Sequence, residues 1–356
     1  MKHRRSTRWP VAATALLLQV AAAQIPTANY RSPEQVRAEF HKLLDRPSGD
    51  LKPDFRSEKI GDLMVESGSF FSEPGEKVPT VIMKQTGRTG RLPVIVCLHG
   101  TGGDKTECSS LLRQFARRGY LAMAIDARYH GDRVPGGANG SRQYNDAVIA
   151  AWRTRPEDKQ THPFWYDTAY DLWRTVDYLV SRPDVDPDRI GMIGISMGGI
   201  QVWLGASVDT RVKVSVPIIA VQSLRWSLEN DRWQPRAATI AEAHAAAARD
   251  LMEPRVNQRV VRTLWNKIVP GILDEFDNPS MIRLFAPRPL LILNAERDPN
   301  NPLPGAELAF EQAKAAYATA GALDRLKIYV APGVAHEVTA EHLRLADEWF
   351  DRWLAP

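Results

Sequence analysis

Cysteine is scarce in this chain, which has two in 356 residues. Two thiols allow one disulfide at most, so the fold must depend on a large apolar core and not on cross-links. Cys97 lies in the strand-like stretch "LPVIVCLHG" and Cys108 in the helix-like stretch "TECSSLLRQFARRG". We expect both thiols to be buried and unpaired.

The chain also lacks a charge excess once its first 23 residues are set aside. The formal net charge is +4, and Lys2, Arg4, Arg5 and Arg8 account for all of it. The remainder therefore has no positive excess with which to attract nucleic acid or an anionic membrane. We expect no nucleic-acid partner and a neutral substrate.

No apolar run is long enough to span a bilayer, but a shorter one follows the basic start of the chain. The stretch "VAATALLLQVAAA" ends in three small residues, Ala21 to Ala23. Such a sequence is typical of an export signal that is later removed. We therefore predict a signal peptide over residues 1–23, a secreted or periplasmic protein, and no stable membrane anchor.

Nucleotide-binding motifs are missing as well. Neither G-x-G-x-x-G nor G-x-x-x-x-G-K-[ST] occurs in the sequence, which argues against a dinucleotide cofactor and against a P-loop. We expect an activity that needs no cofactor and no metal.

What the chain does contain is an alternation of strand and helix patterns. Residues 24–56 are predicted to form an N-terminal arm, with one helix that begins at Ser32-Pro33-Glu34. The β-like stretches "EKIGDLMVESGSFF" and "KVPTVIMKQ" then predict an antiparallel hairpin. Apolar strands and amphipathic helices alternate after it, which is typical of a parallel sheet covered on both faces. We predict an α/β fold over residues 57–356, with a mostly parallel eight-stranded sheet.

One long segment interrupts this alternation. Residues 221–288 contain no strand pattern and are predicted to form a helical insert, a cap, between the sixth and seventh strands. The insert holds Trp226, Trp233 and Trp265, which either bind apolar groups or sugar faces near a site or fix the insert to the core. A second excursion, residues 135–167, is expected to line the opposite wall of that site.

Ser196 stands where a strand turns into a helix. In "RIGMIGISMGG", Gly194 and Gly198 lie two residues to either side of it, which gives the pattern G-x-S-x-G. Small residues there allow a sharp elbow that exposes a nucleophilic hydroxyl at the carboxyl edge of the sheet. The alternative is that Ser196 only caps the helix, for which serine is a favoured residue.

A nucleophilic serine needs a base and an acid that orients the base, and in this fold order both follow later in the chain. Asp298 comes after the apolar strand "PLLILNA", and His336 lies in "VAPGVAHE" after the last strand. Glu296 is the second candidate for the acid. The remaining histidines fall inside the last helix, in the insert or before the nucleophile, so His336 is the predicted base.

An acyl-transfer intermediate carries a negative oxygen that two backbone N–H groups can stabilise. Met197 follows the nucleophile and is the first expected donor. The second should come from the loop "HGTGGDK" after the third strand, where Thr101 is the expected donor and Gly102 the alternative.

With these motifs in this order, the chain resembles the α/β-hydrolase superfamily. The stretch "VDYLVSRPDVDPDRIGMIGISMGG" resembles its dienelactone hydrolase, acetyl xylan esterase and prolyl oligopeptidase-like branch, and the resemblance extends over about 57–356. It implies that Ser196 is the nucleophile, His336 the base and Asp298 its partner. It does not specify a substrate.

Two features depart from the family's pattern. Dienelactone hydrolases typically have a cysteine nucleophile, so Ser196 favours ordinary ester or peptide hydrolysis over lactone chemistry. In "DARYHGDR", Tyr129 stands where relatives often have glycine, and we interpret His130 as scaffolding of that loop.

Three functions fit these observations. The first is a secreted serine esterase that acts through an acyl-enzyme on a small-molecule or carbohydrate ester, such as an acetyl or aryl ester. The others are a serine exopeptidase of the prolyl oligopeptidase-like type and a scaffold that binds a ligand without catalysis. A peptidase of this branch normally has a large additional domain, for which residues 24–90 are too short, and no triad position is broken. We therefore favour the esterase, and the sequence leaves its oligomeric state open.

Overall fold

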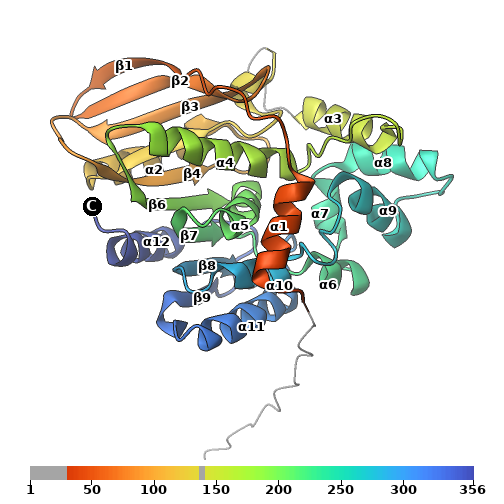
Figure 1. Cartoon of the computed structure of the whole chain (residues 1–356). Helices are drawn as coiled ribbons and strands as arrows, with labels where there is room; N and C mark the ends of the chain where they lie inside the picture. Colours follow the sequence, from red (N-terminus) through yellow and green to blue (C-terminus); the bar gives the residue numbers. More distant parts are fainter. Residues whose placement is uncertain (1–29, 136–140) are drawn as a thin grey trace, which may run out of the picture.

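A nine-stranded sheet runs through the centre of the protein and has helices on both faces (Figure 1). The structure is a computed structural model that describes residues 30–135 and 141–356, so the predicted signal peptide lies outside the described residues. The strand order is β1-β2-β3-β5-β4-β6-β7-β8-β9. The strands are β1 (Asp54–Ile60), β2 (Leu63–Glu73), β3 (Glu76–Gln85), β4 (Leu92–Leu98), β5 (Leu121–Ile125), β6 (Val185–Ile195), β7 (Val212–Ile218), β8 (Leu290–Ala295) and β9 (Leu326–Ala331).

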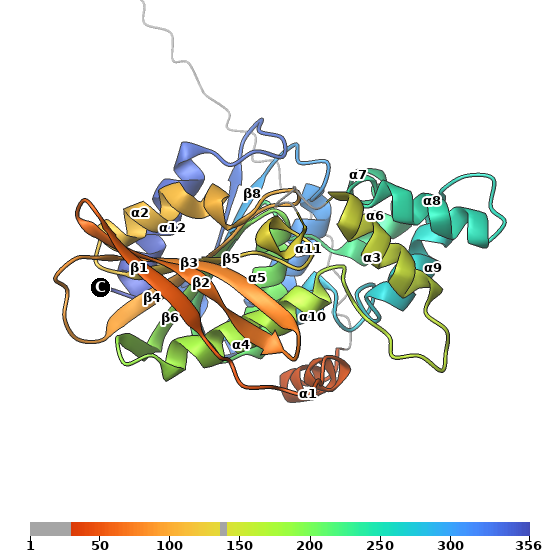
Figure 2. The same ribbon diagram turned by 90° about the horizontal axis from the view of Figure 1, so that it is seen from above.

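The first three strands and the β3–β5 pair are antiparallel, and all neighbours from β5 through β9 are parallel. Two helices, α2 and α12, cover one face, and α1, α4, α5 and α11 cover the other (Figure 2). The helices are α1 (Pro33–Leu43), α2 (Ser109–Arg117), α3 (Ser141–Arg153), α4 (Tyr166–Ser181), α5 (Met197–Val208), α6 (Leu224–Glu229), α7 (Gln234–Ala238), α8 (Ala241–Asp250), α9 (Gln258–Ile268), α10 (Asn278–Met281), α11 (Leu303–Thr319) and α12 (Ala340–Trp353). Short 3-10 turns are η1 (Lys105–Cys108), η2 (Gly131–Arg133), η3 (Ile282–Phe285) and η4 (Leu323–Arg325).

The predicted α/β architecture is confirmed, but the predicted number of strands is wrong by one. The first strand of the predicted hairpin, "EKIGDLMVESGSFF", contains the end of β1 as well as most of β2, and these two strands are joined by a tight turn at Gly61 and Asp62. Gly61 has a φ of +62°, which glycine adopts readily. Since β1 is exposed along almost its whole length, its sequence has no apolar alternation by which to recognise a strand.

The predicted helix of the N-terminal arm is present as α1. Ser32 and Gln35 form a capping box at its start, where each side chain bonds the other residue's backbone N–H. Val36 and Phe40 bury one face of the helix against the body of the protein. The sheet begins at Asp54, so the last residues of the segment predicted as an arm already belong to β1.

The parallel strands are built from apolar residues that leave no face for water. Every residue of β4 and of β8 is buried, as expected for strands with helices on both sides. Helix α5 is also buried along its whole length and is apolar all round. The residue that precedes this helix, Ser196, is therefore held at the start of a helix that is packed on all sides.

The insert, residues 221–288, is helical as predicted and supplies α6 to α10 between β7 and β8. Helix α3 packs against α8 and α9, so this helix of the second excursion lies beside the insert. The expectation that the excursion at residues 135–167 lines the opposite wall of the site stays a prediction. Side chains of the insert, Trp265 among them, belong to the same apolar core as the sheet face beneath α4 and α5.

Cys97 and Cys108 are both buried and unpaired, as expected. Burial raises the pKa of Cys108 to about 12, so this thiol is not a nucleophile at neutral pH. Among the described residues, no helix is both long and apolar enough to cross a membrane.

A buried histidine in the insert should make the fold sensitive to acid. His244 accepts a hydrogen bond from Trp265 Nε1 at 3.1 Å, and its Nδ1 donates to the Ile240 carbonyl at 3.1 Å. Burial lowers its pKa from 6.5 to about 4, so the unfolded chain binds the proton more tightly than the folded chain. We expect the free energy of unfolding to fall by about 3 kcal/mol as the pH falls from 6.5 to 4.

The measurement is denaturant unfolding, followed by tryptophan fluorescence, across that pH range. His244→Gln keeps one donor and one acceptor but does not titrate, and its unfolding free energy should fall less with acid by about this amount. Burial also lowers the pKa of His130 to about 4. The unfolding free energy of His244→Gln should therefore still fall with acid, though less than that of the wild type. Equal slopes in the wild type and in His244→Gln would contradict the assignment.

Candidate active site

Ser196 sits on a strained turn between β6 and α5. Its backbone has φ 52° and ψ −112°, a conformation that non-glycine residues rarely adopt. Its side chain makes no capping hydrogen bond to the helix that follows. The alternative role of Ser196 as a helix cap is therefore wrong, and the hydroxyl is free for another partner.

The two glycines of the motif provide the clearance that the elbow requires. A Cβ on Gly194 would lie 2.4 Å from the backbone of Gly198, and a Cβ on Gly198 would lie 2.4 Å from the Leu98 carbonyl oxygen. Real Cβ atoms do not approach backbone atoms this closely, so any side chain would force strand, helix and the loop after β4 apart.

Gly198→Ala should therefore damage the site. We expect it to displace the loop after β4 and to lower kcat about 100-fold, because a shift near 1 Å is enough to misalign reacting groups. Gly49→Ala is a suitable comparison, because its added Cβ would lie 3.6 Å from Pro74, an ordinary contact, and the residue precedes β1. Wild-type kinetics in Gly198→Ala would show that the elbow tolerates the side chain.

Three predicted residues from three separate segments meet at this turn. Ser196 Oγ lies 2.8 Å from His336 Nε2, and His336 Nδ1 lies 2.8 Å from Asp298 Oδ2. Asp298 follows β8 and His336 follows β9, so both residues stand at the carboxyl edge of the sheet beside the elbow. Asp298 is buried, whereas Ser196 and His336 are partly accessible.

The Asp298 carboxylate accepts hydrogen bonds on both oxygens. Oδ1 accepts from the backbone amides of Asn300 at 2.8 Å and Asn301 at 3.2 Å, and Oδ2 accepts from Asn301 Nδ2 at 2.8 Å in addition to His336. Burial alone would raise the pKa of Asp298, but the hydrogen bonds from His336 and Asn301 outweigh it and hold the pKa below its ordinary value. The residue is therefore an anion that orients His336.

The other candidates from the sequence lie elsewhere. Glu296 is exposed, and its Oε2 accepts from the Gly333 amide at 2.5 Å, so the structure brings Asp298 and not Glu296 to His336. His342 is buried in α12, where it forms a capping box with Thr339. His99 donates from Nδ1 to the Gly100 carbonyl at 2.8 Å and accepts from the Ala127 amide at 3.1 Å.

The loop after β4 lies against the elbow, as the predicted oxyanion site requires. Within residues 30–135 and 141–356, neither the Met197 amide nor the Thr101 amide donates a hydrogen bond to another group. Lys105 fixes the far end of the loop, because its amide and its Nζ each donate to the buried Asp126 at 2.8 Å. The Thr101 amide on this anchored loop and the Met197 amide at the start of α5 are thus both available.

The loop after β5 supports this arrangement without taking part in it. Tyr129 has a φ of +62°, which accounts for the glycine that relatives often have at this place. His130 is fully buried, and its Nδ1 lies 2.8 Å from the Arg128 carbonyl. This contact agrees with the interpretation of His130 as scaffolding.

A cleft of about 520 Å³ opens beside Asp298, between the insert and the loop after β8. Its lining residues are Trp226, Asp231, Arg232, Gln234 and Pro235 from the insert, and Glu296, Arg297, Asp298, Pro299, Pro302, Leu303 and Pro304 from the segment after β8. Trp226 is partly accessible there, whereas Trp265 is buried in the core and Trp233 is nearly so. Only Trp226 of the three tryptophans is placed to contact a ligand in this cleft.

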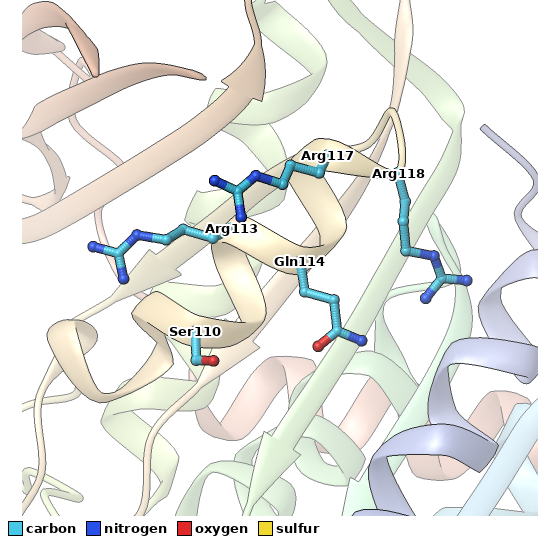
Figure 3. A pocket seen from close by; sticks show the side chains of 5 residues that line it. All are labelled: Ser110, Arg113, Gln114, Arg117 and Arg118. Carbon is cyan, nitrogen blue, oxygen red and sulfur yellow. The ribbon is translucent and has the colours of Figure 1, made fainter. Parts of the chain in front are cut away.

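A second hollow, of about 460 Å³, lies on the outer surface of α2. Figure 3 shows its lining, Ser110, Arg113, Gln114, Arg117 and Arg118. None of the predicted site residues belongs to it. The described part of the chain also contains no group of three or more His, Cys, Asp or Glu side chains that could hold a metal ion.

Sequence reasoning missed two residues next to the triad. Asn301 is fully buried and binds Asp298 through both its backbone and its side chain. Arg236, on α7, reaches the same loop and donates to Asn301 Oδ1 at 3.0 Å. The motif "DPNNP" after β8 was a possible signal for Asn301, but nothing in the sequence around Arg236 distinguishes it from the other arginines of the insert.

The sheet order, the elbow and the loops at its carboxyl edge define a hydrolase of the α/β-hydrolase fold. The profile of the dienelactone hydrolase family matches residues 78–262, and the chain belongs to that family. It is 27% identical over 340 residues to "Putative hydrolase YtaP" of Bacillus subtilis (strain 168), which covers 90% of this chain and 100% of that protein.

Solved structures with the same fold include esterases. The acetyl xylan esterase from Paenibacillus sp. R4 is 19% identical, with a TM-score of 0.61 over 90% of this chain and 93% of that one. The glucuronoyl esterase from Solibacter usitatus is 15% identical, with a TM-score of 0.60 over 88% of this chain and 90% of that one. At these identities the likeness establishes the shared fold.

Proposed function

We propose that this protein is a serine esterase that cleaves carboxylic esters of carbohydrates through an acyl-enzyme. The observation that supports it most directly is the hydrogen-bonded series Ser196, His336 and Asp298 at the elbow. The names of the structural neighbours, which are acetyl xylan and glucuronoyl esterases, support the carbohydrate part. The cleft beside Asp298 supports it too, because an aromatic ring among planar polar side chains suits the face and the hydroxyls of a sugar.

In the proposed reaction, Ser196 Oγ attacks the ester carbonyl carbon while His336 Nε2 takes its proton. The carbonyl oxygen becomes negative and accepts hydrogen bonds from the Met197 and Thr101 amides. The C–O bond to the alcohol then breaks, and His336 returns the proton to the leaving oxygen. Water then attacks the acyl carbon while His336 takes its proton, the bond to Ser196 Oγ breaks, and His336 returns the proton to Oγ as the acid is released. Asp298 holds Nδ1–H throughout, so that Nε2 faces Ser196.

A substrate panel tests this proposal. The purified protein should hydrolyse nitrophenyl acetate and acetylated xylo-oligosaccharides, leave aminoacyl nitroanilides intact, and keep its activity in the presence of a chelator. Turnover of the aminoacyl amides alone would favour the exopeptidase. Absence of turnover on every substrate, together with no labelling by a fluorophosphonate, would favour a scaffold that binds without catalysis.

Replacing Trp226 should show whether the cleft contacts the sugar of a substrate or only its acyl group. Trp226→Ala is expected to lower kcat/KM for acetylated xylo-oligosaccharides about tenfold, because it removes the one aromatic face that the described residues give the cleft. Hydrolysis of nitrophenyl acetate, which has no sugar, should change less than twofold. Trp152→Ala, at a partly buried tryptophan on α3 that does not line the cleft, is the matched control. Equal losses on both substrates would mean that Trp226 supports the fold only.

We also propose that residues 1–23 direct export and are removed, that residues 24–56 form an arm, and that residues 57–356 form the catalytic domain with residues 221–288 as its cap. The basic start, the short apolar stretch and Ala21 to Ala23 support the first of these. N-terminal sequencing of the protein recovered outside the cytoplasm should begin at Gln24. A mature protein that begins at Met1 would contradict it.

A further inference from the structure

Arg236 is a buried cation that the insert brings to the loop of Asp298. It is 2% exposed, and its Nη2 donates to the Asn300 carbonyl at 3.2 Å and to Asn301 Oδ1 at 3.0 Å. Among the described residues, Arg236 forms no ion pair with a carboxylate, and its Nε has no hydrogen-bond partner. Its guanidinium carbon lies 5.9 Å from the centre of the Trp165 ring. Burial of a guanidinium without a carboxylate partner is costly, and here it lowers the pKa of Arg236 to about 10. Such a cost indicates a role beyond packing.

The contacts of Asn301 show what that role is. An arginine can only donate, so the atom of Asn301 that faces it must be the oxygen. Nδ2 then points the other way and donates to Asp298 Oδ2 at 2.8 Å and to the Ile219 carbonyl at 2.6 Å. Each side-chain atom of Asn301 therefore has a partner that accepts only one orientation of the amide.

The same network ties α6 to this loop. The Asn300 carbonyl accepts from Gln222 Nε2 at 2.6 Å as well as from Arg236, and Gln222 in turn accepts from Ser227 on α6. The amide of Asn300 donates to Asp298 Oδ1 at 2.8 Å. Side chains of the insert thus hold Asn300 and Asn301, the two residues that donate to the two oxygens of the Asp298 carboxylate.

We propose that Arg236 is a positioning residue for the reaction, which acts through Asn301 to hold the Asp298 carboxylate in the orientation that His336 requires. The inference rests on the proposed esterase function, and it assigns to the insert a part in assembling the triad. Loss of the guanidinium frees Asn301 Oδ1, loosens Nδ2 from Asp298 and lets the carboxylate rotate away from His336.

The test compares Arg236→Met, Arg236→Lys, Asn301→Ala and the double variant Arg236→Met/Asn301→Ala with the wild type. For Arg236→Met, kcat on nitrophenyl acetate should fall about 10- to 100-fold while KM stays within about twofold. Arg236→Lys, which keeps a donor and the charge, should recover part of kcat. The double variant should be no slower than the slower single variant, because both changes interrupt the same series of contacts from Arg236 through Asn301 to Asp298, which we call the Arg236 relay.

A proton NMR signal provides a readout that does not depend on turnover. The Nδ1–H of His336, bonded to Asp298, should give a far-downfield resonance in the wild type that broadens or moves upfield in Arg236→Met. Arg262→Met is the control for the chemical change, because Arg262 is a partly exposed arginine of the same insert. Arg288→Met is the control for the loss of an arginine bonded to the main chain, since Arg288 is partly buried and donates to the carbonyls of Ala206 and Val212. Both controls should keep the resonance, whatever they do to the melting temperature.

An unchanged resonance and kcat in a folded Arg236→Met, or losses in kcat that multiply in the double variant, would overturn the relay. A wild type without esterase activity would instead overturn the proposed function, and the resonance would still decide whether Arg236 orients the Asp298–His336 pair.

Discussion

Replacing Ser196 with alanine is expected to lower kcat for nitrophenyl acetate by roughly 10⁴- to 10⁶-fold. The hydroxyl is the only group in the elbow that can form the acyl-enzyme, and its Oγ is the atom that His336 Nε2 contacts at 2.8 Å. The variant should keep its fold, because Ser196 makes no capping bond and its side chain is only partly buried. KM should stay similar, since the cleft beside Asp298 is unchanged.

Two measurements check this expectation. The first is turnover of Ser196→Ala beside that of Ser110→Ala, a serine exposed on α2 that should be silent. The second is labelling by a fluorophosphonate, with the modified residue identified by mass spectrometry. Label on Ser196 in the wild type and none in the variant is the expected result. Label on another serine, or substantial turnover in Ser196→Ala, would remove the nucleophile assignment.

The meeting of Ser196, His336 and Asp298 was predictable because each of them marks a change in the local pattern. Ser196 interrupts an apolar run between glycines, and Asp298 and His336 follow strands that consist almost wholly of apolar residues. In a parallel sheet the carboxyl ends of the strands share one edge, so three distant segments had to meet there. The sequence pattern could not decide whether Asp298 or Glu296 bonds His336, because that depends on how the chain turns after β8.

The insert illustrates the opposite case. Its helices could be predicted, but the partners of its side chains could not, because a helix without a strand next to it in the sequence has no fixed place on the sheet. The role of Arg236 could not be predicted, because it depends on the contacts between α7 and the loop of Asp298. In the same way, the packing of α3 on α8 and α9 joins segments that are far apart in the chain.

Asp298→Asn is the second change for which we expect a large loss. An asparagine can present its NH₂ to His336 Nδ1, and this favours the tautomer with the proton on Nε2, which can no longer accept the Ser196 proton. The effect on kcat should be about 10⁴-fold, with little change in KM. The isosteric side chain can keep the hydrogen bonds from the Asn300 and Asn301 amides to Oδ1, so the loop should remain folded.

Glu296→Gln is the matched control, because it makes the same chemical change two residues away. The Glu296 side chain accepts from the Gly333 amide, whereas the carboxylate bonded to His336 is that of Asp298, so kcat of Glu296→Gln should stay within about threefold of the wild type. The outcome that would reassign the acid is the reverse order, with Glu296→Gln inactive and Asp298→Asn active. A moderate loss in both variants would mean instead that His336 takes its orientation from the loop as a whole, and the Arg236 relay would then be the first place to look for the groups responsible.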